Sequence, residues 1–117
     1  MIRFLLDTDH LSLQQRGHPH LAKRLAEHSS EEVATSVVSM EEMIRGRLAI
    51  LSRRSEGEPR ISAYRRLQET VQLFCTIPTV AFDPSSEQRF QELKTLRLKV
   101  GSQDLRIAAI VCFFCRP

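Results

Sequence analysis

Residues 2–9 read IRFLLDTD, a short apolar run that ends in acidic residues around a threonine. A run of this length that stops at polar residues is typical of a buried β-strand. Thr8 and Asp9 are residues that begin helices, because their side-chain oxygens accept hydrogen bonds from free backbone N–H groups. The stretch therefore predicts a strand over residues 2–6, which leads directly into a short helix that ends near Gln15.

The same succession of strand and helix recurs along the chain. Residues 33–38 read VATSVV and are rich in β-branched side chains, so they predict a second strand. Residues 76–82 predict a third strand, which Pro78 confines to a sheet edge or to a short piece. Strands that alternate with helices indicate an α/β domain with a parallel sheet. The further helices are expected over residues 19–28, 39–51, 60–74 and 84–100, and from residue 104 onward.

Caps and apolar spacing give more detailed expectations for these helices. Ser39, followed three residues later by Glu42, is a capping-box pattern, and it places the start of a helix at Ser39. Gly101 is expected to end the helix before it. The inward positions expected from helical spacing are Ile61, Tyr64, Leu67, Val71 and Phe74 in one helix, and Phe90, Leu93, Leu96 and Val100 in the next.

The bulk composition bounds the class of protein. The chain has 117 residues and a formal net charge of +3, which predicts one domain with a mildly basic surface. Such a surface is compatible with a nucleic-acid partner, although the charge alone favours an ordinary soluble protein that happens to be basic. No apolar run reaches the roughly 18 residues that cross a bilayer. Asp7 and Asp9 interrupt the apolar start, so no signal peptide is expected and the predicted location is the cytoplasm.

Three carboxylates occupy the junctions between strands and helices. Asp7 ends the first strand, Glu42 lies early in the helix after the second, and Asp104 opens the last helix. Ligands of parallel sheets gather at the carboxyl ends of the strands. Two carboxylates at about 4 Å repel by on the order of 4 kcal/mol at an effective dielectric of 20, and Mg²⁺ or Mn²⁺ offsets this cost. Such a cation activates water for phosphodiester hydrolysis. Alternatively, each acid is a helix cap or a first-turn residue, and the residues alone leave both readings open.

Three segments resemble the motifs of PIN domains. Residues 5–13, LLDTDHLSL, resemble the opening motif, in which an apolar strand delivers an Asp followed by a hydroxyl residue. Residues 35–48, TSVVSMEEMIRGRL, resemble the second motif, and residues 101–110, GSQDLRIAAI, the third. The segments occur in the family's order and at its usual separations. The resemblance covers the chain up to about Ile110 and is closest to the VapC branch.

The resemblance implies a role for each acid. In the second motif an acid stands four residues before a Gly, so counting back from Gly46 selects Glu42 rather than Glu41. By resemblance, Asp7, Glu42 and Asp104 would be the catalytic and metal-binding residues, with Thr8 and Asp9 as auxiliary residues. Candidates for contact with RNA are Arg45, Arg47, Lys99 and Arg106, although basic side chains on a solvated helix face are an equally good explanation.

The resemblance also implies a fold, an activity and partners. The expected fold is a PIN-like three-layer α/β domain with a short central parallel sheet between helices. The expected activity is that of a Mg²⁺- or Mn²⁺-dependent endoribonuclease toxin from a type II toxin–antitoxin system. Its expected partners are an RNA substrate, a cognate VapB-like antitoxin and a second copy of the chain.

The C-terminal end departs from the family pattern. Family members continue past the last helix with a strand and a loop that carries a further polar residue, whereas this chain ends in IVCFFCRP. We therefore expect a single PIN-like domain over residues 1–117 that lacks the last strand or strands. The alternative function is a catalytically inactive remnant that binds only the antitoxin or itself. A receiver-like or phosphatase-like acidic site is disfavoured, because the lysine and threonine of such sites have no counterpart in their usual places.

Overall fold

The computed structural model describes residues 2–53 and 56–114, with side chains through residue 111, and it is built around a short parallel sheet. Strands β1 (Phe4–Leu6), β2 (Val33–Ser36) and β3 (Thr79–Val80) pair in the order β1-β2-β3. The central strand β2 is buried along its whole length. The α/β class and the parallel sheet predicted from the sequence are confirmed, including the edge position of the strand that follows Pro78.

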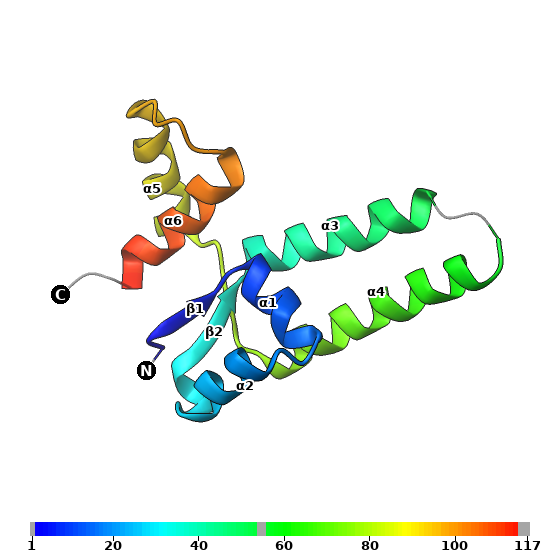
Figure 1. Cartoon of the computed structure of the whole chain (residues 1–117). Helices are drawn as coiled ribbons and strands as arrows, with labels where there is room; N and C mark the ends of the chain where they lie inside the picture. The colour runs from blue at the N-terminus through cyan, green and yellow to red at the C-terminus, as the bar shows by residue number, and fades with distance from the viewer. Residues whose placement is uncertain (1, 54–55, 115–117) are drawn as a thin grey trace.

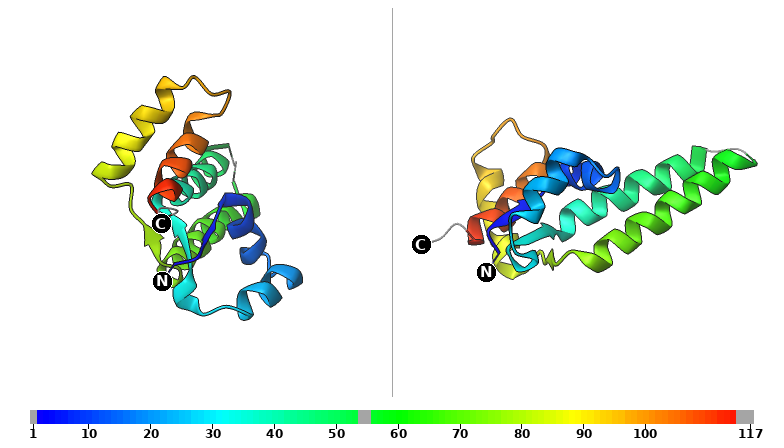
Figure 2. Two further views of the ribbon diagram at one scale, coloured as in Figure 1. Left: turned by 90° about the vertical axis from the view of Figure 1, so that its left-hand side faces the viewer. Right: turned by 60° about the horizontal axis from the view of Figure 1, so that its bottom comes forward.

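Helices surround the sheet in the described part of the chain (Figure 1). Helices α5 and α6 lie on one side of β1 and β2, α1 and α2 lie on the other, and α3 and α4 form a long antiparallel hairpin that projects beyond the sheet (Figures 1 and 2). A short 3₁₀ helix precedes β2. The helices are α1 (Thr8–Gln15), α2 (Pro19–Ala26), α3 (Val37–Arg53), α4 (Glu58–Thr76), α5 (Pro84–Thr95) and α6 (Ser102–Phe114).

Two hydrophobic clusters hold these layers together. The larger one joins the sheet to α1 and α3 through Leu6, Leu11, Val33 and Met43, all of which are buried. The smaller cluster lies between α5 and α6, and its buried members are Phe90, Leu105 and Ala109. No helix of the described residues has the length and apolar character that a membrane crossing requires.

The capping box predicted at Ser39 is wrong. Helix α3 begins at Val37, and the Ser36 hydroxyl accepts a hydrogen bond from the backbone N–H of Ser39 at 3.0 Å. Ser36 therefore caps the helix. The predicted strand over residues 33–38 ends early for the same reason, because the register pairs Ser36 with Val80, the last residue of β3. Beyond Ser36 the sheet offers no further backbone partner on that side, whereas a helix satisfies each backbone group internally.

The inward face predicted for α4 is also wrong in part. Ile61, Tyr64 and Val71 are 52%, 57% and 48% exposed, and the buried residues of this helix are Ala63 and Thr70. Its main neighbour is α3, which approaches along the stripe of small residues rather than the stripe of large ones. The hairpin thus leaves several of its larger apolar side chains exposed, whereas Leu73 and Phe74 pack against the larger core cluster.

Helix α5 stops earlier than expected. It ends at Thr95 rather than at Gly101, because Arg97 adopts a φ of 52° and turns the chain out of the helix. Leu96 and Val100, predicted to point inward, lie in the following loop and are 63% and 47% exposed. Helix α6 begins at Ser102, close to the start predicted near Asp104.

Candidate functional site

Asp7 stands where β1 passes into α1, as the sequence predicted, and it is the cap of that helix in place of Thr8 or Asp9. Its Oδ1 accepts a hydrogen bond from the His10 backbone N–H at 2.9 Å and lies 2.6 Å from His10 Nδ1. Partial burial alone would raise the pKa of Asp7, but the hydrogen bonds and the charge of His10 outweigh it and lower that pKa below its usual value. The Asp7 carboxylate is therefore ionised at neutral pH.

Thr8 connects the first motif to the second. Its hydroxyl donates a hydrogen bond of 2.9 Å to Glu42 Oε2, across 34 positions of sequence. Both side chains are partly buried, so this contact orients the Glu42 carboxylate beside the start of α1. Asp9, the other auxiliary residue predicted, lies in the first turn of α1 and is exposed.

Glu41 connects the second motif to the third, a contact that sequence reasoning missed. Gln103 donates a hydrogen bond of 3.0 Å to Glu41 Oε1, Arg45 forms an ion pair with the same carboxylate, and Arg106 lies 4.0 Å away. The hydrogen bond from Gln103 is the main reason that the pKa of Glu41 is lowered, and the charges of Arg45 and Arg106 lower it further. Successive helix residues differ by about 100° in direction, so Glu41 faces α6 while Glu42 faces α1. The adjacent pair of acids in the sequence was the available indication.

Asp104 lies in the first turn of α6, one residue after Gln103, and it is exposed. The three motif segments thus meet, but of the three predicted acids only Glu42 takes part in these contacts, whereas Asp7 and Asp104 are represented by their neighbours Thr8 and Gln103. Among the side chains that the structure describes, no group of three or more His, Cys, Asp or Glu residues is close enough to hold a metal ion. The carboxylates have the oxygen donors that Mg²⁺ prefers, yet their placement is not that of a ready-made cation site.

Two of the basic candidates are exposed and two are partly buried. Lys99 and Arg45 are exposed, whereas Arg106 is partly buried and donates a hydrogen bond of 2.7 Å to Gln103. Arg47 is partly buried as well: its Nε donates to Thr70 Oγ1 and its Nη2 to Gln15 Oε1, both at 3.0 Å.

Arg47 therefore joins three helices, and burial is the main reason that its pKa is lowered, followed by the charges of Arg66 and Arg16. At least two of its N–H groups are used within the protein. Contact with RNA by any of the four basic candidates stays a prediction.

These features define the class of the protein: an α/β domain with a short parallel sheet, in which the starts of α1, α3 and α6 meet and carry acidic residues. No family model and no curated protein matches the sequence.

Solved structures do match, and one of them is described as a toxin–antitoxin complex. The DNA-bound VapBC of Salmonella typhimurium aligns with a TM-score of 0.70 at 19% identity, over 94% of this chain and 79% of that one. A toxin–antitoxin complex from Klebsiella pneumoniae aligns with a TM-score of 0.65 at 17% identity, over 95% and 78%. FitAcB from Neisseria gonorrhoeae aligns with a TM-score of 0.62 at 23% identity, over 92% and 78%. This chain therefore has the fold of those chains, and the expected PIN-like architecture is confirmed.

Proposed function

We propose that this chain is a toxin of a toxin–antitoxin pair that hydrolyses RNA phosphodiester bonds in the cytoplasm. The observation that carries the proposal is the meeting of three separated acidic motifs, through Thr8 with Glu42 and through Gln103 with Glu41. The shared fold supports it, because one of the matching structures is a toxin–antitoxin complex. In this proposal Asp7, Glu42 and Asp104 are the catalytic carboxylates.

The chain's own residues provide the electrostatics of the proposed site. Asp7 is ionised at neutral pH, and Thr8 fixes the direction of the Glu42 carboxylate. Arg45 and Arg106 lie beside the carboxylate of Glu41, the residue next to Glu42, and would attract a phosphate backbone. Mg²⁺ or Mn²⁺ is the cation that an all-oxygen donor set would select. Because the described side chains do not form a group of three, cation binding requires that they rearrange.

RNA cleavage by the purified chain tests the proposal. We expect cleavage of a labelled RNA with added Mg²⁺ or Mn²⁺ and none with a chelator. The variants Asp7→Asn, Glu42→Gln and Asp104→Asn should each cleave ~100-fold more slowly or worse, a loss typical of removing one electrostatic group from a catalytic site. Asp9→Asn is the matched control, because Asp9 is an exposed acid two positions from Asp7. Equal cleavage by the wild type and by Asp7→Asn would show that the activity comes from a contaminant.

A second function is favoured by one specific observation. The described side chains hold no group of three potential metal ligands, so the chain has the fold without a preformed cation site. In this alternative the protein binds an antitoxin, or a second copy of itself, without cutting RNA. Stable co-purification with the product of a neighbouring antitoxin-like gene, together with no cation-dependent cleavage, would support it. Light scattering at several protein concentrations measures the proposed homodimer in the same experiment.

A further inference from the structure

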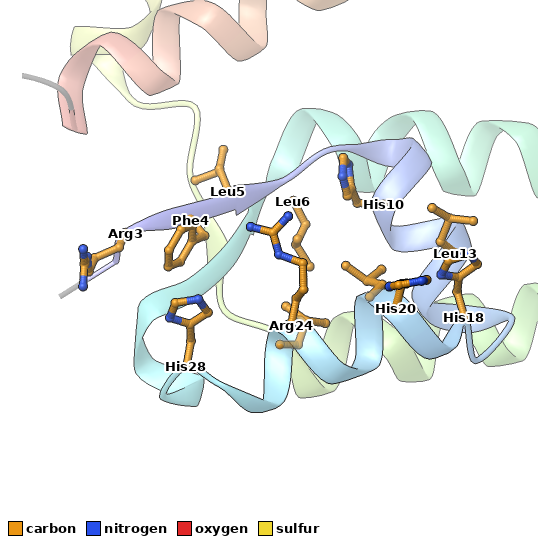
Figure 3. A pocket seen from close by; sticks show the side chains of 12 residues that line it. Arg3, Phe4, Leu5, Leu6, His10, Leu13, His18, His20, Arg24 and His28 are labelled. Carbon is orange, nitrogen blue, oxygen red and sulfur yellow. The ribbon is translucent and has the colours of Figure 1, made fainter.

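A cavity of about 490 Å³ opens between β1 and α2, on the side of β1 away from α5 and α6 (Figure 3). Its volume lies within the range of about 300–1,000 Å³ that is typical of ligand sites. Its apolar lining includes Leu6, which is buried, and Leu13, Leu21 and Leu25, which are partly buried. Every residue that lines the cavity is either apolar or basic, and none carries a carboxylate or a hydroxyl.

The basic residues of this cavity include all four histidines of the chain. Two acids oppose them from outside the lining: Asp7 contacts His10, and Glu32 lies 3.6 Å from Arg3 and 3.8 Å from His28. Of the two guanidinium groups in the lining, that of Arg3 faces Glu32, whereas that of Arg24 forms no ion pair within the described residues. The basic lining residues are Arg3, His10, His18, His20, Arg24 and His28.

The cavity also runs along an open strand edge. Strand β1 pairs with β2 on one side and has no other strand partner in the described structure. The backbone N–H of Thr35 donates to Pro78 O on the β3 side, so the parallel pairing of Leu6 with Thr35 uses the backbone groups of Leu6. Backbone groups alternate in direction along a strand, and those of Leu5, which also lines the cavity, therefore point to the open edge. The Phe4 ring, 4.4 Å from the ring of His28, forms part of the cavity wall beside that edge.

We propose that this cavity binds an extended peptide that carries acidic and apolar side chains in alternation, and that the peptide adds as a strand to the open edge of β1. The guanidinium of Arg24, in a lining without carboxylates, selects acidic side chains, and the leucines select apolar ones. Side chains alternate between the two faces of a strand, so one peptide presents both kinds at fixed positions. A nucleic acid suits the site less well, because its backbone does not complement a strand edge and phosphates gain nothing from the leucine lining.

Arg24 offers the sharpest test of this proposal. It lines the cavity from α2, is exposed, and has the exposed residue Lys23 beside it on the same helix but outside the lining. Arg24→Glu and Lys23→Glu change the net charge equally. Binding is measured by fluorescence anisotropy with a labelled peptide of about eight residues, a usual strand length, that alternates Glu and Val. The second peptide has Lys at every Glu position, and a third carries N-methyl groups on alternate amides.

We expect saturable binding of the acidic peptide only. Arg24→Glu should weaken this binding about tenfold, because Arg24 lies within the proposed interface, whereas Lys23→Glu should hardly change it, because Lys23 lies outside. N-methylation of the alternate peptide amides that face β1 should abolish binding, because it removes the N–H groups that donate hydrogen bonds to the strand. Equal effects of the two variants, equal binding of the acidic and basic peptides, or no saturable binding would each overturn the proposal. If an RNA oligonucleotide displaces the acidic peptide, and if Arg24→Glu abolishes binding of that oligonucleotide, the cavity is a nucleic-acid site and the proposal is overturned.

Discussion

Thr35 joins the two strands that carry the first two motifs, and its replacement by Val tests how firmly they are joined. The side chain is 0% exposed, and its hydroxyl donates a 2.8 Å hydrogen bond to the carbonyl of Leu6, the residue before Asp7. Valine has nearly the same shape, so Thr35→Val removes the hydrogen bond without a cavity. The carbonyl of Leu6 also lies in the parallel pairing of β1 with β2, so the change removes one of its hydrogen bonds and does not leave it unpaired. A buried hydrogen bond contributes about 1 kcal/mol, and we therefore expect the free energy of unfolding to fall by about 1 kcal/mol.

Urea denaturation followed by circular dichroism measures this change, and thermal unfolding should show a Tm lower by a few degrees. Thr79→Val is the matched control in the neighbouring strand. Its hydroxyl is only partly buried and its contact with Ile77 O is 3.4 Å long, so we expect a change within ~0.5 kcal/mol. A Thr35→Val protein as stable as Thr79→Val would refute the idea that this hydrogen bond fixes the end of β1.

Two further predictions concern helix caps. Ser36→Ala removes the cap of α3 and leaves the Ser39 N–H unpaired, so it should lower the free energy of unfolding by about 1 kcal/mol. Ser52→Ala, at the exposed end of the same helix, is the control and should change the free energy of unfolding little. Hydrogen bonds from the N–H and hydroxyl of Ser86 lower the pKa of Asp83, the cap of α5. The ionised Asp83 carboxylate therefore stabilises the fold fully above its unfolded-state pKa of roughly 4. This stabilisation is lost as the pH falls through the lower pKa that Asp83 has in the folded state. Denaturation midpoints from pH 7 to acid should accordingly fall less steeply in Asp83→Asn than in the wild type.

The order of elements followed from the sequence because it depends on local chemistry. Apolar runs stop at Asp7 and before α3, and the caps and turns lie within a few residues of where the structure has them. The choice between Ser36 and Ser39 as the cap did not follow. It depends on where β3 stops, at Val80, and hence on a partner strand more than 40 positions away. Local pattern gives both serines the same capping chemistry.

The candidate site was likewise predicted only in part from the sequence. Topology alone predicts that the starts of α1, α3 and α6 meet, and the contacts of Thr8 with Glu42 and of Gln103 with Glu41 bear this out. The positions of individual carboxylates depend on which neighbour each one contacts, and motif spacing contains no information on that choice. Asp7 contacts His10, an interaction that no motif of the sequence indicated.

His10 links the two proposals, because it contacts Asp7 and also lines the cavity beside β1. An acidic peptide in the cavity would compete with Asp7 for the ring of His10, and loss of that contact would return the pKa of Asp7 toward its usual value. The two proposals nevertheless fail separately. Asp7→Asn changes the carboxylate of the RNA-cleavage proposal and leaves Arg24 in place, whereas Arg24→Glu changes the cavity without touching Asp7, Glu42 or Asp104. A protein that binds the peptide but cuts no RNA would therefore retain the inferred interface while losing the proposed enzymatic function.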